Sequence, residues 1–196
     1  NGYVLLNRYG NFSLSPVTNG AFNFNEIFCP DDTQFTLKGF DVENLQQSDS
    51  IAYSFTTPIT NVGNLQACTA VDEFISYQID NNPTIFLLQN IRGGLNIQGG
   101  LPPSGGLNLN AYSTNNQPGM SIWGSANVPG IYFITTFQIE GEVGYIGPGT
   151  VNTIQFILNQ FGPVGGYIDM TFSGTYQDAN NQTHTLTGVA HVIRDN

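Results

Sequence analysis

Short runs in which apolar and polar residues alternate recur along the whole chain, and they constrain its fold most strongly. The clearest run is Ala21-Phe22-Asn23-Phe24-Asn25, which follows the turn-forming pair Asn19-Gly20. Successive residues of a β-strand point to opposite faces of the sheet, so this alternation gives a strand one apolar and one polar face. Asn-Gly favours a two-residue hairpin turn. No useful run has a helical period, and Ile154–Phe161 is rich in residues that favour a strand. The sequence therefore predicts an all-β protein with almost no helix.

The expected strands are short, regularly spaced and separated by turns, a pattern typical of antiparallel sandwiches and barrels. The glycine-rich stretch 92–106 could be a linker, but leucine and isoleucine alternate with polar residues at both of its ends. We therefore expect a strand, a loop and a second strand there. Placing a boundary near residues 69–79 predicts two antiparallel β-sandwich domains in tandem, 1–75 and 76–196. The expected strands of the second domain include 74–79, 84–89, 121–123, 131–140, 152–159, 167–176 and 183–194.

Charged residues are scarce, and this excludes several classes of partner. They make up 9% of the chain, whereas typical soluble domains have about 25%. The net charge is -10 and only four residues are basic, so there are no Lys or Arg clusters to neutralise phosphates. We expect no nucleic-acid ligand and no anionic membrane surface as partner. No apolar run approaches the roughly 20 residues of a transmembrane helix, and Asn1 is expected to begin a mature or trimmed chain.

The chain has two cysteines, Cys29 and Cys68. Two cysteines cannot form a Cys-rich zinc site, and no Cys-x-x-Cys motif is present. An Asn-rich composition with little lysine is typical of an exported protein, and disulfides persist outside the cytosol. We therefore predict a Cys29–Cys68 disulfide, with two buried free thiols as the alternative.

Four motifs within residues 1–70 carry a family resemblance. They are Asn1-Gly2-Tyr3-Val4, Asn19-Gly20-Ala21-Phe22-Asn23-Phe24, Leu37-Lys38-Gly39-Phe40-Asp41 and Asn61-Val62-Gly63-Asn64-Leu65-Gln66-Ala67-Cys68. Together they resemble carboxypeptidase regulatory-like domains, which are transthyretin-like β-sandwiches of bacterial surfaces. The resemblance implies no peptidase residues. That family usually has an edge strand before the first motif, so the first strand is expected to be missing here.

The C-terminal segment carries a second resemblance. Gly165–Tyr176 followed by Leu186–Arg194 is similar to the closing hairpin of uncharacterised exported lipoproteins of the Bacteroidota. In those proteins a Gly-x-Phe-Ser-Gly strand pairs with a final Gly-x-Phe-x-Val strand, from which Val189-Ala190-His191-Val192 departs. The resemblance implies an outer-membrane or cell-surface location, and neither family implies an enzyme.

Few residues could support catalysis. His184 and His191 are seven residues apart in one expected strand, so they should lie on opposite faces and cannot converge on one substrate. Glu140 and Glu142 are expected to share a strand face, and two carboxyl groups about 5–9.5 Å apart could hydrolyse a glycosidic bond. Adjacent acids on one strand are more often a solvated face. We therefore expect no enzyme, and a carbohydrate-active enzyme is the rival.

Loop residues could bind an ion or carry a glycan. Asp31, Asp32 and Asp41 could hold a structural calcium ion, although solvated loops are the plainer reading and no other cofactor is expected. Asp49-Ser50-Ile51 resembles the O-glycosylation signal of the Bacteroidota, which would make Ser50 a glycan acceptor. Asn11-Phe12-Ser13 and Asn181-Gln182-Thr183 are formal N-glycosylation sequons for a eukaryotic secretory route.

Aromatic residues are the remaining candidates for ligand binding. Tyr112, Trp123 and Tyr132, with Tyr145, could stack on sugars if one face exposed them together, and the amides of Asn115-Asn116-Gln117 are close in sequence to Tyr112. A lone tryptophan in a sandwich is more often part of the core.

The sequence therefore predicts a non-enzymatic structural or adhesion protein, located outside the cell or on a bacterial cell surface. Its expected partners are other surface proteins or copies of itself. One alternative is a carbohydrate-binding module. Another is a fibre subunit in which a neighbouring chain donates a strand beside Gly2-Tyr3-Val4, because an incomplete sandwich exposes unpaired backbone groups.

Overall fold

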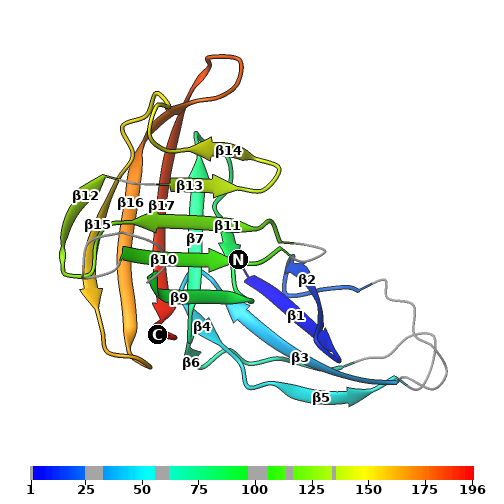
Figure 1. Cartoon of the computed structure of the whole chain (residues 1–196). Coiled ribbons are helices and arrows are strands. Elements are labelled where there is room, and N and C mark those ends of the chain that lie inside the picture. Colours follow the sequence, from blue (N-terminus) through cyan, green and yellow to red (C-terminus); the bar gives the residue numbers. More distant parts are fainter. Residues whose placement is uncertain (1, 25–32, 56–61, 97–105, 114–116, 134–135) are drawn as a thin grey trace. The chain divides into compact units, whose positions relative to one another are not determined.

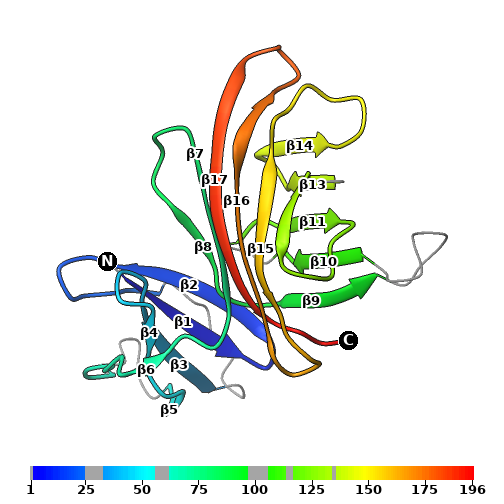
Figure 2. The same ribbon diagram turned by 90° about the vertical axis from the view of Figure 1, so that its left-hand side faces the viewer.

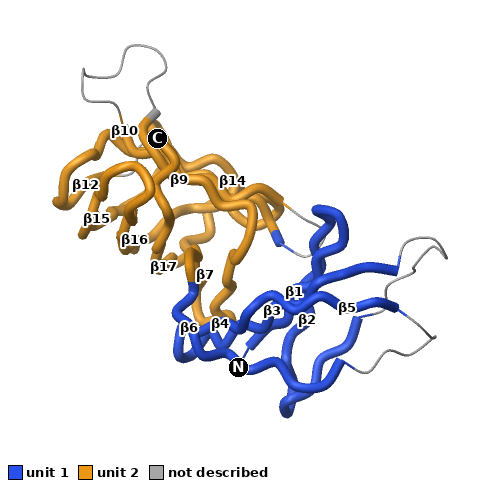
Figure 3. Tube along the Cα trace, turned by 90° about the horizontal axis from the view of Figure 1, so that it is seen from below, with its two compact units in different colours: residues 1–71, 114–117 blue, residues 72–113, 118–196 orange. Residues whose placement is uncertain are grey.

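A computed structural model describes residues 2–24, 33–55, 62–96, 106–113, 117–133 and 136–196. Within these ranges the chain forms strands, turns and loops and no helix, and all strand pairs are antiparallel (Figures 1 and 2). The all-β prediction is confirmed. The chain divides into two compact units, residues 1–71 with 114–117 and residues 72–113 with 118–196 (Figure 3). The boundary predicted from the sequence was residue 75.

Unit 1 contains one sheet, in the order β2-β1-β3-β4-β6 with β5 paired to β3. Two-residue turns at Tyr9-Gly10 and Asn19-Gly20 have positive φ at both positions, 49° and 83° in the first and 52° and 77° in the second. Such turns match the twist of a hairpin, so the predicted turn at Asn19-Gly20 is confirmed. The strand expected after it is not found in residues 21–24, where Ala21 makes one isolated bridge to Thr18. The strands are β1 (Gly2–Arg8), β2 (Asn11–Val17), β3 (Gln34–Asp41), β4 (Gln46–Gln47), β5 (Ile51–Ser54) and β6 (Thr69–Ala70).

Strand β1 lies inside this sheet and not at an open edge. It pairs with β2 from Gly2 to Arg8 and with β3 from Gly2 to Asn7. The edge is β2, whose Pro16 lacks a backbone N–H and so fits a strand that pairs on one side only. The prediction that a neighbouring chain pairs beside Gly2-Tyr3-Val4 is therefore wrong, because the chain's own β2 and β3 occupy both sides.

The core of unit 1 is small. Val4, Leu6, Phe35 and Leu37 are buried on one face of the sheet, and Phe35 stacks on Tyr53 with ring centroids 5.7 Å apart. Within the described residues this unit has one sheet, so its expected second layer stays a prediction. Cys29 lies outside the described residues. Cys68 is exposed and has no disulfide partner among them, so the predicted bridge stays a prediction.

Unit 2 consists of two sheets that share one hydrophobic core. The first has the order β14-β13-β11-β10-β9, and the second has the order β12-β15-β16-β17-β7-β8. Figures 1 and 2 show the strands of the first sheet running across β15, β16 and β17 of the second. The strands are β7 (Phe74–Ile79), β8 (Ile85–Leu87), β9 (Ile91–Asn96), β10 (Gly106–Ala111), β11 (Met120–Gly124), β12 (Gly130–Phe133), β13 (Thr136–Ile139), β14 (Val143–Ile146), β15 (Gln155–Phe161), β16 (Tyr167–Gln177) and β17 (Thr183–Ile193).

Alternation along the strands builds this core. Leu107 and Leu109 of β10, Ile122 of β11 and Phe137 of β13 point inward from the first sheet and are almost completely buried. Phe156, Leu158, Ile168, Met170, Phe172, Leu186, Ala190 and Val192 meet them from the second sheet. Because the period is two, the residues between them face away from the core.

The strand predictions for unit 2 succeed with one exception. Within the stretch 92–106, β9 ends at Asn96 and β10 begins at Gly106, and the residues between them lie outside the described part of the chain. Ile154–Phe161 contains the whole of β15. The single strand predicted over 131–140 is wrong, because β12 and β13 lie in different sheets. Among the described residues, no helix has the length and apolar character that crossing a bilayer requires.

Candidate functional site

The outward face of the five-stranded sheet in unit 2 presents an aromatic ring among amides and hydroxyls. On β11, Met120, Ile122 and Gly124 are buried, so Ser121 and Trp123 face outward, and Trp123 is 42% exposed. The same alternation turns outward Asn108 and Asn110 of β10 and Thr136 and Gln138 of β13. We call this surface the Trp123 face; its members are Arg92, Asn108, Asn110, Tyr112, Ser121, Trp123, Thr136, Gln138 and Glu140.

Strand register places these side chains in two rows. Trp123 lies directly between Asn108 and Thr136, and Ser121 lies between Asn110 and Gln138. Residues directly opposite on neighbouring strands have Cβ atoms about 4.5–5.5 Å apart, so each row is continuous. The Asn110 amide donates to Asn108 Oδ1 at 2.7 Å, and the Ser121 hydroxyl donates to Asn110 Oδ1 at 2.9 Å. These bonds fix the orientation of the amides beside the indole ring.

A cavity of about 340 Å³ lies at one end of the face. Its lining includes Tyr112, Gly119, Ser121, Gln138 and Glu140. Tyr112 is 53% exposed, and the Arg92 guanidinium carbon lies 5.8 Å from the centre of its ring. This distance is within the range of a cation–π interaction. The cavity therefore combines a ring, a carboxylate, an amide and a hydroxyl.

Two of the three predicted aromatic residues belong to this face and the third does not. Tyr132 lies on β12 of the other sheet, where its ring stacks on Phe156 and its hydroxyl donates to the Val128 carbonyl at 2.9 Å. Tyr145 of β14 is exposed, and its ring lies beside Gly147. Asn115 and Asn116 lie outside the described residues, and Gln117 is buried.

Sequence reasoning missed the polar members of the face. Asn108 and Asn110 alternate with Leu107 and Leu109, and Ser121 alternates with Met120 and Ile122. The alternation contains the signal that these residues face outward. The missing information was the strand order, which alone shows that they are neighbours of Trp123.

Glu140 and Glu142 do not share a strand face. They flank Gly141 in the tight turn between β13 and β14, where Gly141 has a φ of 77°. Glu140 lines the cavity on the Trp123 face, whereas Glu142 lines a different groove and accepts a hydrogen bond of 2.8 Å from the Tyr77 hydroxyl. The predicted shared face is wrong because the chain reverses between them.

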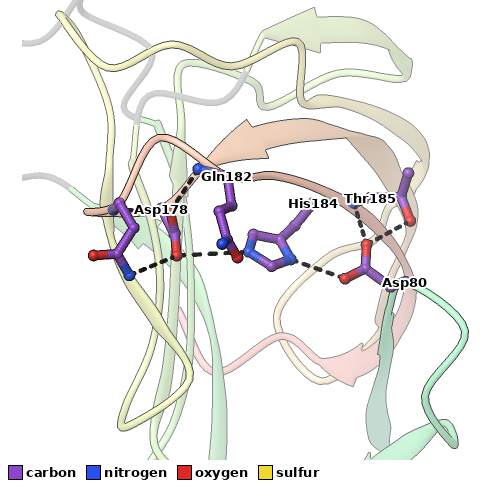
Figure 4. A network of polar contacts seen from close by, with 6 residues as sticks. Asp80, Asp178, Gln182, His184 and Thr185 are labelled. Carbon is purple, nitrogen blue, oxygen red and sulfur yellow. Dashed lines mark hydrogen bonds and ion pairs between the residues drawn. The ribbon is translucent and has the colours of Figure 1, made fainter.

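That second groove, of about 590 Å³, contains a network centred on His184 (Figure 4). His184 Nδ1 lies 2.8 Å from Asp80 Oδ2, and Nε2 lies 3.8 Å from Asp178 Oδ2. Asp80 also accepts hydrogen bonds from the backbone N–H and hydroxyl of Thr185. The imidazole stacks on Tyr176, with ring centroids 5.3 Å apart. This network connects the turn after β7 to the turn before β17.

Contacts within this network raise the pKa of the imidazole and lower the pKa values of the two carboxyl groups. The hydrogen bond that the imidazole donates to Asp80, with the charges of Asp80 and Asp178, raises the pKa of His184 above its ordinary 6.5. The hydrogen bond from His184 lowers the pKa of Asp80 below 3.8, and the backbone N–H of Gln182 does most to lower the pKa of Asp178. The Asp178 carboxylate therefore accepts its main hydrogen bonds from the backbone of its own turn, and it interacts with His184 at a longer distance.

We expect Asp80→Asn to lower the melting temperature in a pH-dependent way. The raised His184 pKa gives stability that is complete below pH 6.5 and is lost as the pH rises through the folded-state value. The lowered Asp80 pKa gives stability that is present above pH 3.8 and is lost as the pH falls through the folded-state value. The difference from wild type should therefore be largest near pH 5–6 and smaller at pH 9, as calorimetry at several pH values will show. Asp49→Asn, in an exposed loop, is the control; an equal effect of both variants would contradict the assignment.

The two histidines lie on opposite faces of β17, as the sequence predicts. His184 shares the side of the buried Leu186 and Ala190, whereas His191 points to the other side, hydrogen-bonds to Asp169 at 2.5 Å and stacks on Tyr167. They cannot act on one substrate.

The predicted calcium and glycosylation residues do not form a defined site in the described part of the chain. Asp31 and Asp32 lie outside it. Asp41 ends β3 and accepts hydrogen bonds from Glu43 and Asn44, and the Asn44 side chain does most to lower its pKa. Among the described residues, no cluster of three or more His, Cys, Asp or Glu side chains could hold a metal ion. Ser50 is exposed just before β5.

Comparisons of this chain with models of known families, with curated proteins and with solved structures found no match.

Proposed function

We propose that this chain is a non-enzymatic surface protein that binds glycans through the Trp123 face. The observation that supports this proposal best is the position of the chain's only tryptophan, which stands exposed between Asn108 and Thr136 of the neighbouring strands. The polar row of Asn110, Ser121 and Gln138 lies beside it on the same sheet. A ring on a sheet loses little entropy on binding, because packing of the strands already fixes its backbone.

The chemistry of the face fits a sugar. One face of a pyranose ring presents C–H groups, which pack on an aromatic ring, and its edges present hydroxyls. Amides such as Asn108 and Gln138 both donate and accept hydrogen bonds, so they can satisfy either role of a hydroxyl. Asn110 and Ser121 already bond to one another, which orients them before a ligand arrives.

A binding role fits this geometry better than hydrolysis does. A glycosidase needs two carboxyl groups on either side of one bond. Glu140 and Glu142 line different cavities, so the pair considered from the sequence does not flank a common cleft. Glu140 is instead available as a hydrogen-bond acceptor.

The cellular setting of this proposal is the outside of a bacterial cell. A composition with 9% charged residues and many neutral amides suits an exported protein, and both family resemblances lead to cell-surface proteins. We infer that the two units act as β-sandwich domains in tandem, with unit 2 supplying adhesion to glycans of a neighbouring surface.

Trp123→Ala tests this function directly. The variant should lose glycan binding by at least about tenfold, because a central aromatic residue of an interface typically contributes 2 kcal/mol or more. The measurement is a glycan array with wild type and variant, followed by a hydrolysis screen of every bound glycan.

The matched control is Phe133→Ala, which removes a ring that is 72% exposed on the other sheet of unit 2. It should bind like wild type. Equal loss in both variants, or release of reducing sugar from a bound glycan, would contradict the proposal.

A further inference from the structure

The carboxylate of Glu140 lines the cavity beside Tyr112, and it packs over Gly119, which has no side chain. A Cβ atom at Gly119 would lie 2.9 Å from Glu140 Oε2, so the carboxylate is folded over this glycine. The Glu140 backbone N–H donates to the Gly119 carbonyl at 2.8 Å, and this bond joins the start of β11 to the end of β13. Any larger residue at 119 would push the carboxylate away from the cavity.

The donors and acceptors around that carboxylate define what it can bind. A carboxylate accepts hydrogen bonds and donates none, and its two oxygens match two neighbouring hydroxyl donors. Gln138 and Ser121 line the same cavity and can serve the adjacent hydroxyls, while the Tyr112 ring bounds it. This arrangement fits a pyranose that presents a vicinal diol.

The same carboxylate disfavours an acidic sugar. A second carboxylate placed within about 4 Å of Glu140 would meet like-charge repulsion that water screens only in part. The cation of the face, Arg92, lies over the Tyr112 ring and is not among the residues that line the cavity. The net charge of -10 adds repulsion at longer range.

We propose that the Tyr112–Glu140 cavity selects neutral glycans, with Glu140 accepting hydrogen bonds from a vicinal diol, and that it excludes uronic acids. This selectivity rests on the proposed glycan-binding function. It assigns to Glu140 the role of a specificity-determining residue and to Trp123 the role of a platform for a neighbouring sugar.

The test uses hexasaccharides of neutral β-1,4-glucan, β-1,3-glucan, β-1,4-xylan and β-1,4-mannan, with an α-1,4-galacturonan hexasaccharide as the acidic probe. Calorimetry should show that the wild-type chain binds at least one neutral probe and does not bind the galacturonan. Glu140→Gln should weaken the neutral probe about tenfold, because it replaces a charged acceptor with a neutral one. It should also give measurable binding of the galacturonan.

The control is Glu142→Gln, which removes the same charge from the same turn but lines the other groove. It should behave like wild type with every probe. If neutral probes bind and Trp123→Ala abolishes that binding, but Glu140→Gln changes neither affinity nor selectivity, the selectivity proposal fails and the binding function stands. If the wild type prefers the galacturonan, the selectivity proposal also fails, and the glycan-binding function stands. Failure of the wild type to bind any of the five probes rejects both.

Discussion

Phe156→Ala should lower the free energy of unfolding of unit 2 by about 3–5 kcal/mol, the usual cost of removing a buried phenylalanine ring. Phe156 is completely buried in the core shared by the two sheets. Its ring stacks on Tyr132, and a Cβ atom at Gly124 would lie 2.2 Å from its Cζ. The ring therefore occupies space that Gly124 leaves open, and its loss creates a cavity between two sheets that cannot close over it.

Urea unfolding followed by tryptophan fluorescence measures this effect, because the single tryptophan lies in unit 2. Ile157→Ala is the control. Ile157 is the next residue on β15, but it faces away from the core and is 44% exposed. Its loss should change the free energy of unfolding by about 0.5 kcal/mol. Similar losses in the two variants would mean that β15 does not turn Phe156 into the core and Ile157 away from it.

Gly188→Ala should destabilise unit 2 by about 1–3 kcal/mol even though it adds a single methyl group. A Cβ atom at this position of β17 would lie 2.1 Å from Phe172 Cζ and 2.6 Å from the Ser76 carbonyl oxygen. Phe172 is held in the core, and the carbonyl belongs to the backbone of β7. Neither can move aside without disturbing the sheet.

Gly144→Ala is the matched control for this overpacking. It lies in β14, has no heavy atom within 4 Å of the added Cβ, and is not among the glycines with a positive φ. It should be neutral or slightly stabilising, because alanine restricts the unfolded chain. The double variant Gly188→Ala with Phe172→Leu should lose less than the sum of the single variants, since the smaller side chain leaves room for the methyl group. Strict additivity in the unfolding experiment would contradict the contact.

Local patterns in the sequence predict most strands but not the sheets to which they belong. Alternation identified β7, β10 and β17, and Asn19-Gly20 identified a turn. The split of 131–140 into β12 and β13 was missed, because both halves have strand-like residues and their pairing partners are far away in sequence. The interior position of β1 was missed for a similar reason: the Tyr9-Gly10 turn, with tyrosine at a positive φ, is not a common hairpin signal.

The candidate site shows the same limit. Trp123 and Tyr112 could be selected from the sequence as exposed aromatic candidates, but Tyr132 could not be separated from them. On β12 the apolar Ile131 and Phe133 face outward and Tyr132 packs on the core, which reverses the usual preference. Only pairing with β15 fixes that direction.

Acrylamide quenching of tryptophan fluorescence, measured with and without the neutral hexasaccharide that binds most tightly, tests whether a glycan covers Trp123. Trp123 is the only tryptophan, so the signal reports on the proposed face alone. We expect saturation with the sugar to protect Trp123 from quenching and to shift its emission to shorter wavelength. Saturation that leaves both quenching and emission unchanged would show that the glycan binds away from Trp123, and would contradict the proposed role of the Trp123 face.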